Sequence, residues 1–198
     1  MLDVRDYKVW LDRALNLAML LVAVAALYLL TTERLLPALR GAPERLGVGG
    51  QLAAALEFRT LAKGELGTGA SGDIAVPGER PTLLFVFNST CAACYVNLSA
   101  WQEVMDAAGG KATVLAVALE RERSAAHGYA RRHLPAAMAV VPKDAREFAG
   151  TLGVDIVPFT ALVGRDGVLE FVRPGSLDSL AVCSLLRALG ALAASSNS

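Results

Sequence analysis

Residues 82–94 read TLLFVFNSTCAAC, and this stretch decides which fold the chain can adopt. Thr82–Asn88 is a short apolar run, which is typical of a strand buried on both faces of a parallel sheet. Ser89-Thr90 supplies N-cap chemistry, so the pattern predicts a helix over Cys91–Ala108 that ends at the glycine pair that follows. A buried strand is therefore expected to lead directly into a helix whose first turn carries a C-x-x-C pair.

The C-x-x-C spacing places Cys91 at a helix N-terminus, where unpaired N–H groups and the helix dipole favour a thiolate. Cys94 lies one turn further along the helix, close enough to attack a mixed disulfide formed at Cys91. Strand, C-x-x-C and helix in this order are typical of redox chemistry. The sequence predicts that Cys91 attacks and that Cys94 resolves.

Metal binding fits these residues less well than redox chemistry does. A structural zinc site needs four ligands, and the chain has no second C-x-x-C or Cys/His pair. A c-type haem would require a histidine directly after the second cysteine, where Tyr95 stands. We therefore expect neither a metal nor an organic cofactor.

The rest of the chain alternates strand and helix signals. Apolar strand patterns cover four stretches, Ala112–Leu119, Met138–Val141, Phe159–Val163 and Val168–Val172. Helical patterns cover three, Arg121–His133, Lys143–Leu152 and Leu177–Ala194. A small hairpin is expected within Gln51–Gly67, followed by a glycine-rich surface loop over Thr68–Gly78. This order predicts an α/β protein, a mixed sheet with helices on both faces.

Composition separates this domain from the N-terminus. The chain has 198 residues, of which 54% are hydrophobic and 19% charged, with 19 basic and 19 acidic side chains. This balance excludes a disordered chain and a phosphate-neutralising protein, so no nucleic-acid partner is expected. The hydrophobic excess is concentrated in Ala14–Leu30, where Asn16 alone falls outside the hydrophobic set. The composition predicts one membrane segment attached to one globular domain.

As a helix, Ala14–Thr32 would span about 28 Å, close to the thickness of a bilayer's hydrocarbon core. The run is longer than the apolar region of a cleaved signal peptide, and no Ala-x-Ala site follows promptly. A cleaved signal and a buried core helix remain the alternatives. We expect residues 1–13 to form a flank, 14–32 a transmembrane anchor, 33–50 a juxtamembrane linker and 51–198 the globular domain.

Together, these features resemble the thioredoxin fold. A proline at 158 precedes a late strand, a Gly-Arg-Asp-Gly hairpin follows at 164–167, and a helix closes the chain. With one N-terminal anchor the chain resembles the TlpA/ResA/MauD-like thiol–disulfide oxidoreductases (the redoxin group) of bacterial envelopes. The resemblance covers roughly Gln51 to Ala194.

The resemblance implies roles for individual residues. Cys91 would attack, Cys94 would resolve, and Pro158 would be cis and face the disulfide. Val157 would offer backbone hydrogen bonds to an extended substrate. The substrate-binding residues expected beside the cysteines are Thr90, Ala92 and Ala93.

It also implies partners and a location. The expected partners are protein disulfides or dithiols and an upstream membrane electron donor, with the lipid bilayer around the N-terminal helix. Basic residues before the span number the same as those soon after it but are more tightly clustered. We therefore expect a single-pass protein of the bacterial inner (cytoplasmic) membrane, with its domain on the periplasmic side.

The chain departs from the family at the positions that would handle protons. The family often has tryptophan where Thr90 stands, and Ala92-Ala93 replaces a proline-containing pair. Asn97 occupies the place of a family glutamate, and an amide cannot accept the proton of Cys94. The preceding strand, residues 83–87, contains no carboxylate. The proton acceptor and the direction of electron flow therefore stay open.

Two other functions stay open as alternatives. A peroxiredoxin-like peroxide reductase shares the fold but expects threonine three residues before its cysteine, where Asn88 stands. A metallochaperone or assembly factor would use Cys91 and Cys94 as soft ligands without catalysis. Outside the site, we expect Cys183 to be a buried, inert thiol and His127 and His133 to be solvated.

Overall fold

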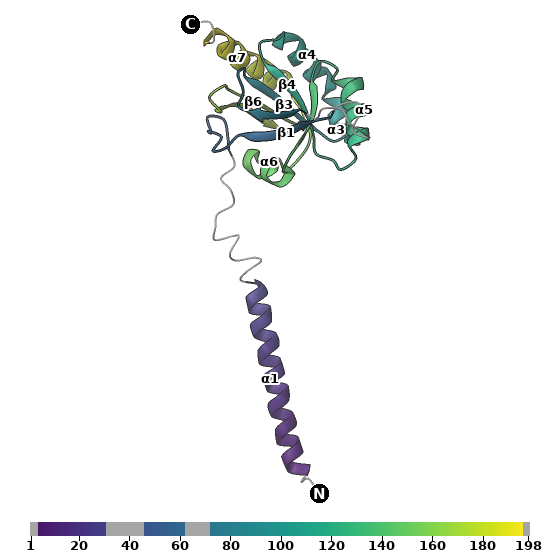
Figure 1. The fold of residues 1–198 in the computed structure, drawn as a ribbon, viewed down its shortest axis with the longest axis vertical. Coiled ribbons are helices and arrows are strands. Elements are labelled where there is room, and N and C mark those ends of the chain that lie inside the picture. Colours follow the sequence, from purple (N-terminus) through teal and green to yellow (C-terminus); the bar gives the residue numbers. More distant parts are fainter. Residues whose placement is uncertain (1–3, 31–45, 62–71, 196–198) are drawn as a thin grey trace. The chain divides into compact units, whose positions relative to one another are not determined.

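A computed structural model describes residues 4–30, 46–61 and 72–195 of the chain, which divides into two compact units, Met1–Glu44 and Arg45–Ser198. The first unit contains helix α1 (Val4–Leu30), drawn in purple in Figure 1. Its side chains from position 15 to position 28 are all exposed. Within the described residues, no helix is both long enough and apolar enough to cross a membrane. The expected anchor and linker both extend into residues 31–45, which lie outside the described part of the chain.

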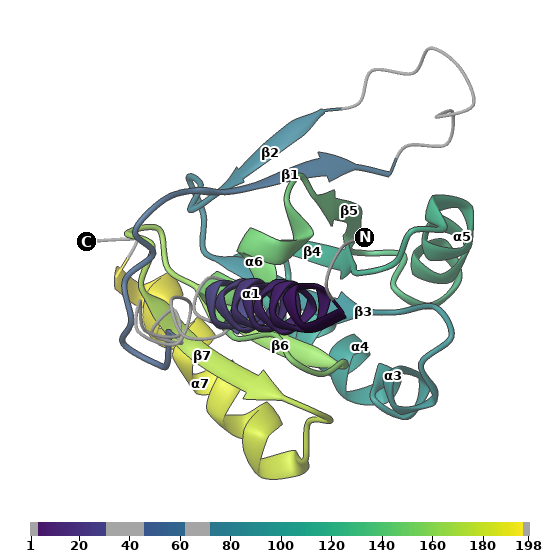
Figure 2. The same cartoon turned by 90° about the horizontal axis from the view of Figure 1, so that it is seen from below.

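The second unit is built on a sheet that has seven strands within the described residues, in the order β2-β1-β5-β4-β3-β6-β7. The strands are β1 (Leu56–Thr60), β2 (Asp73–Val76), β3 (Thr82–Phe87), β4 (Thr113–Ala118), β5 (Met138–Pro142), β6 (Phe159–Val163) and β7 (Leu169–Pro174). β3, β4 and β5 run parallel to one another, and the other neighbouring pairs are antiparallel. Figure 2 shows the β1–β2 hairpin at one edge of the sheet and β7 at the other.

Helices cover both faces of this sheet, as the sequence predicts. They are α3 (Ala92–Val96), α4 (Leu98–Ala108), α5 (Arg123–His133), α6 (Ala145–Leu152) and α7 (Ser179–Ser195). Leu83, Phe85 and Phe87 of β3 pack in one core with side chains of α4, α5 and α7. Leu84 and Val86, which point the opposite way, share a second core with side chains of α6. Figure 1 shows α6 on the opposite side of the sheet from α4 and α7.

Parallel pairing of β3 with β4 determines where the site lies. Phe87, the last residue of β3, stands opposite Ala118, the last residue of β4. The carboxyl ends of both strands therefore lie on the same side of the sheet, and the loop after β3 leads into α3. The carboxyl ends of parallel strands are the usual place for sites in open α/β sheets.

Two predictions about local structure were wrong. The loop expected over Thr68–Gly78 contains a strand, β2, which pairs antiparallel with β1. Lys143 joins the two strands at their polar side through ion pairs with Glu57 (3.0 Å) and Asp73 (2.8 Å). The partner expected for β1, near residues 65–66, lies outside the described residues.

The helix expected over Cys91–Ala108 is divided at Asn97 into α3 and α4. Asn97 is buried, and its Oδ1 atom accepts a hydrogen bond from the N–H of Leu177 at 2.7 Å. The division therefore lies where the helix is tied to the segment before α7. The backbone of Asn97 keeps its helical partners, because its N–H donates to the Ala93 carbonyl and its carbonyl accepts from the Trp101 N–H, each at 3.1 Å.

Candidate active site

The loop between β3 and α3 is closed by Asn88. Its backbone carbonyl accepts a hydrogen bond from the Cys91 N–H at 3.0 Å. Its side-chain Oδ1 accepts two more from Thr90, from the N–H at 2.9 Å and from the hydroxyl at 2.7 Å. The Thr90 hydroxyl therefore bonds within the loop, and the loop places Cys91 at the start of the helix.

Cys91 is itself the N-cap of α3. Its backbone is extended (φ −79°, ψ 111°), and its Sγ accepts a hydrogen bond from the Cys94 N–H at 3.2 Å. The sequence had pointed to Ser89-Thr90 for this capping role, whereas the sulfur performs it. A thiolate at this position would receive a charge-assisted hydrogen bond at the positive end of the helix.

Cys94 has the opposite environment. Its side chain is fully buried among the core residues of α4 and α5. Burial raises the pKa of the Cys94 thiol from 9.0 to about 12, and the contact with Cys91 adds to this shift, whereas a backbone hydrogen bond from Asn88 opposes it. Cys94 is therefore a neutral thiol near pH 7. All three cysteines are free, including the C-x-x-C pair.

The segment before β6 completes the site. The Val157–Pro158 peptide bond is cis, and Pro158 is buried. Cys91 Sγ lies 3.5 Å from the Val157 carbonyl oxygen, to which the thiol donates. The Pro158 carbonyl accepts a hydrogen bond from the Gly175 N–H at 2.8 Å, which ties this segment to the end of β7. The structure thus brings together Cys91, Cys94 and Val157 from two distant parts of the chain.

The surroundings of Cys91 are open and apolar. Ala92 and Ala93 are exposed beside it, as are the larger side chains of Tyr95, Val96 and Ile156. A small hollow of about 130 Å³ adjoins the site, lined by Asn88, Leu119, Val154, Asp155, Ile156 and Val157. This surface can accept an extended chain that passes Val157.

Beneath the site lies a group of aromatic rings. The Tyr129 ring stacks on Phe87 with centroids 4.7 Å apart, and Tyr95 and His133 contact it at 5.1 and 4.9 Å. His133 is therefore half-buried in ring contacts, and His127 is half-buried as well, so the prediction that both are solvated is right only in part. The Tyr129 hydroxyl is buried and has no hydrogen-bond partner within the described residues.

Trp101 supports the same region from α4. Its side chain is fully buried and stacks on Phe85, with ring centroids 5.1 Å apart. Its indole N–H donates to the Thr160 hydroxyl oxygen at 2.9 Å. The bond ties the helix that follows the C-x-x-C pair to the strand that follows Pro158.

The structure adds one acidic residue that sequence reasoning missed. Glu120, two residues beyond β4, accepts hydrogen bonds from the N–H of Ser89 at 2.8 Å and from its hydroxyl at 2.6 Å. Counting two residues past the ends of the parallel strands β3 and β4 would have placed Ser89 beside Glu120. The search for a carboxylate in β3 itself overlooked this neighbour.

Cys183 was predicted to be buried, and this was wrong. It is exposed on α7, on the same side as Leu180 and Ser184. Its neighbours Val182 and Leu185 face the core, and the helical period turns position 183 away from them.

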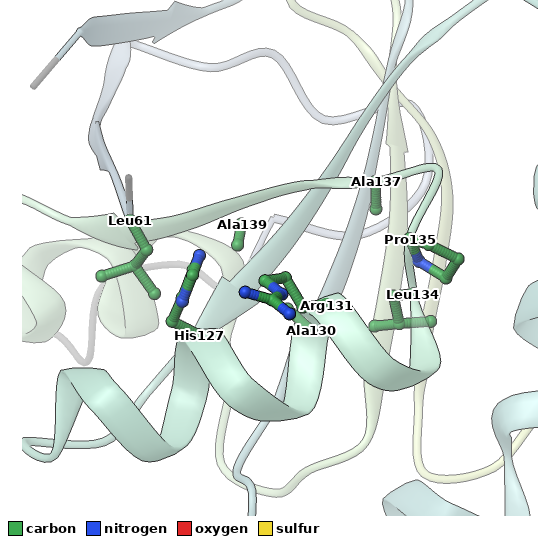
Figure 3. A pocket seen from close by; sticks show the side chains of 8 residues that line it. All are labelled: Leu61, His127, Ala130, Arg131, Leu134, Pro135, Ala137 and Ala139. Atoms are coloured by element: carbon green, nitrogen blue, oxygen red, sulfur yellow. The ribbon is translucent and has the colours of Figure 1, made fainter. Parts of the chain in front are cut away.

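A separate cavity of about 220 Å³ lies against α5, shown in Figure 3. Its lining includes His127, Arg131 and Leu61, and it contains neither cysteine of the C-x-x-C pair. The predicted thiol chemistry belongs to Cys91 and Cys94, and neither residue lines this cavity.

No family model matches the chain, and no curated protein matches it. Solved structures do. StoA from Bacillus subtilis is 19% identical, with 69% of this chain and 98% of that chain covered and a TM-score of 0.51. DsbF from MTB is 19% identical, with 74% and 99% covered and a TM-score of 0.54. The thioredoxin domain of a thiol-disulfide oxidoreductase from Bacteroides vulgatus is 13% identical, with 75% and 99% covered and a TM-score of 0.57. The chain therefore has a thioredoxin-like fold.

Proposed function

We propose that the chain is a thiol–disulfide oxidoreductase that exchanges disulfides with protein cysteines. The arrangement of its two thiols is the observation that carries this proposal. Cys91 is a half-buried sulfur that caps a helix, and Cys94 is a fully buried thiol one turn behind it. Such a pair combines an accessible attacking sulfur with a protected resolving one.

The exchange proceeds in two steps. The Cys91 thiolate attacks one sulfur of a substrate disulfide, and the other substrate sulfur leaves as a thiolate and takes up a proton. Cys94 then loses its proton and attacks Cys91 Sγ, and the second substrate sulfur leaves. The protein ends with a Cys91–Cys94 disulfide, and the substrate has gained two electrons and two protons. The same steps in reverse would oxidise a substrate dithiol.

The surface around Cys91 supports a polypeptide substrate. Val157 is half-buried next to the attacking sulfur and can offer its backbone to an extended strand. Thr90, Ala92 and Ala93 flank Cys91 in the chain and are exposed, and their side chains are small. The exposed apolar side chains of Tyr95, Val96 and Ile156 favour an unfolded or loosely folded partner over a small polar thiol.

The membrane tether and the location outside the cytoplasm are parts of the same proposal. The apolar run Ala14–Leu30 supports them, as does the exposure of the α1 side chains from position 15 to 28, which need an apolar partner. A domain held at the membrane would receive electrons from an upstream membrane donor. An alkaline wash of membranes should leave the full chain in the pellet, and release into the supernatant would contradict the tether.

The proposed activity is tested with the purified full chain. The reduced chain should reduce the disulfides of a protein substrate, and Cys91→Ser should abolish this reaction. Cys94→Ser should stop after one turnover, at a mixed disulfide with Cys91. The matched control is Cys183→Ser, which removes the exposed thiol of α7 and should leave the rate unchanged. Full activity in Cys91→Ser would contradict the proposed function.

A further inference from the structure

The cavity beside α5 is built from three parts of the chain (Figure 3). They are α5 itself, the loop that joins it to β5, and the residue that follows β1. Six side chains make its apolar wall: Leu61, Ala130, Leu134, Pro135, Ala137 and Ala139. Leu61, Ala130 and Leu134 are buried and belong to the core that also contains Cys94. The wall of the cavity is therefore formed in part by fixed core side chains.

The backbone around the cavity is already hydrogen-bonded. The Leu61 N–H donates to the Ala139 carbonyl at 2.8 Å. In the turn after α5, the N–H groups of Leu134 and Ala137 donate to carbonyls at 2.8 and 3.0 Å. Pro135 has no N–H. Because these main-chain donors are occupied or missing, the polar group of a ligand would have to meet side chains.

His127 and Arg131 are the two polar side chains that line the cavity. They lie four residues apart on α5 and therefore share one face of the helix. Figure 3 shows both in the space between α5 and the segment that carries Ala137 and Ala139. Arg131 is exposed, and His127 is half-buried. A guanidinium group has five N–H donors and no acceptor, so the group that it recognises has to be an acceptor.

The charge on this side of the molecule is positive. From Arg123 to His133, α5 contains three arginines, two histidines and no carboxylate. No carboxylate lines the cavity within the described residues, and neither His127 nor Arg131 takes part in an ion pair there. An anion in the cavity would therefore meet attraction without a competing acidic side chain.

We propose that this cavity binds a small carboxylic acid with an apolar body. Its carboxylate would meet Arg131 and His127, and its ring or branched chain would lie on the apolar wall. The planar guanidinium of arginine can hold both oxygens of a carboxylate at once. An apolar cavity of about 150 Å³ is large enough for benzene, so the volume of about 220 Å³ leaves room for one ring and its carboxylate. The site uses neither cysteine of the C-x-x-C pair, so the proposal is independent of the thiol chemistry.

The experiment titrates the purified full chain with benzoate and follows binding by calorimetry and by NMR of labelled alanine methyl groups. We expect saturable binding of one benzoate per chain, with shifts of the Ala137 and Ala139 methyl signals. Acetate keeps the charge without the ring, and benzyl alcohol keeps the ring without the charge. Each should bind at least about tenfold more weakly than benzoate, because each loses one of the two contributions.

Variants separate the charge from the cavity. Arg131→Gln removes the charge and should weaken benzoate binding by about ten- to a hundredfold, as expected for a lost hydrogen bond to a charged group. Arg132→Gln is the matched control, because Arg132 is exposed on the same helix and does not line the cavity, and it should bind as the parent does. Ala137→Leu keeps both polar side chains and fills part of the cavity, so it should weaken benzoate more than acetate.

Three results would overturn the proposal. They are the lack of saturable benzoate binding, equal losses of affinity in the two arginine variants, and methyl shifts confined to alanines outside the cavity. Thermal unfolding of each variant checks that the fold is kept. A chain that binds benzoate but exchanges no protein disulfides would contradict the proposed function and leave this site standing.

Discussion

The hydrogen bond between Trp101 and Thr160 allows a quantitative test of how the site is supported. Both side chains are fully buried, and the indole N–H donates to the Thr160 hydroxyl at 2.9 Å. Thr160→Val keeps the shape of the side chain and removes this acceptor. The indole N–H would then be buried without a partner, which costs about 1–3 kcal/mol of unfolding free energy.

For a domain of this size, that loss corresponds to a fall in Tm of roughly 3–10 °C. Thr82→Val is the matched control, because Thr82 is also buried in a strand but donates only a long bond, 3.4 Å, to the Arg80 carbonyl. It should change stability by less than about 1 kcal/mol, since no buried donor loses its partner. Thermal unfolding of the full chain, followed by near-ultraviolet circular dichroism, measures both. Equal losses in the two variants would refute the role assigned to Thr160.

Three further predictions concern Tyr129, Asp144 and Cys94. Tyr129→Phe removes a buried hydroxyl that lacks a partner and keeps the ring on Phe87, so unfolding free energy should stay level or rise by up to about 1 kcal/mol; a clear loss would contradict this. Asp144→Ala removes the N-cap of α6, where Asp144 accepts from two N–H groups at 2.9 Å, and should cost about 1 kcal/mol in denaturant unfolding. Because the pKa of Cys94 rises from 9.0 to about 12 on folding, the reduced protein should lose stability as pH increases between those values. Burial also raises the pKa of Tyr129 above 10.0, so both redox forms should lose some stability above about pH 10, and the Cys94 contribution is the part of the loss that the protein with a Cys91–Cys94 disulfide lacks; equal losses in the two forms would contradict it.

The sequence anticipated those parts of the fold that depend on short-range patterns. Apolar runs located β3 and β4, and the Gly-Arg-Asp-Gly stretch at 164–167 located the hairpin between β6 and β7. These signals are strong because a buried strand needs continuous apolar residues and a tight turn needs glycine. The pairing of Cys91 with Val157 needed the resemblance to the thioredoxin fold, because 66 residues separate the two.

The misses share a physical cause, which is that tertiary contacts overrode local signals. β2 lies in a glycine-rich region and is a strand because β1 and Lys143 hold it. The expected helix is divided at Asn97, whose buried side chain bonds the N–H of Leu177, a partner far along the chain. Glu120 was missed because its contact with Ser89 depends on the register of β4 against β3, which the residues of β3 alone do not show. Helical periodicity around Cys183 could have indicated its exposure.

The central claim is that Cys91 forms the mixed disulfide and Cys94 resolves it. The most direct test expresses the chain with Cys94→Ser in its native host, quenches thiols with acid, and identifies disulfide-linked adducts by mass spectrometry. A Cys183→Ser background removes the exposed third thiol from consideration. We expect protein adducts attached to Cys91, and none in the chain that carries Cys91→Ser instead. Adducts on Cys94 in the Cys91→Ser chain, with none on Cys91 in its counterpart, would contradict the assignment of the two thiols.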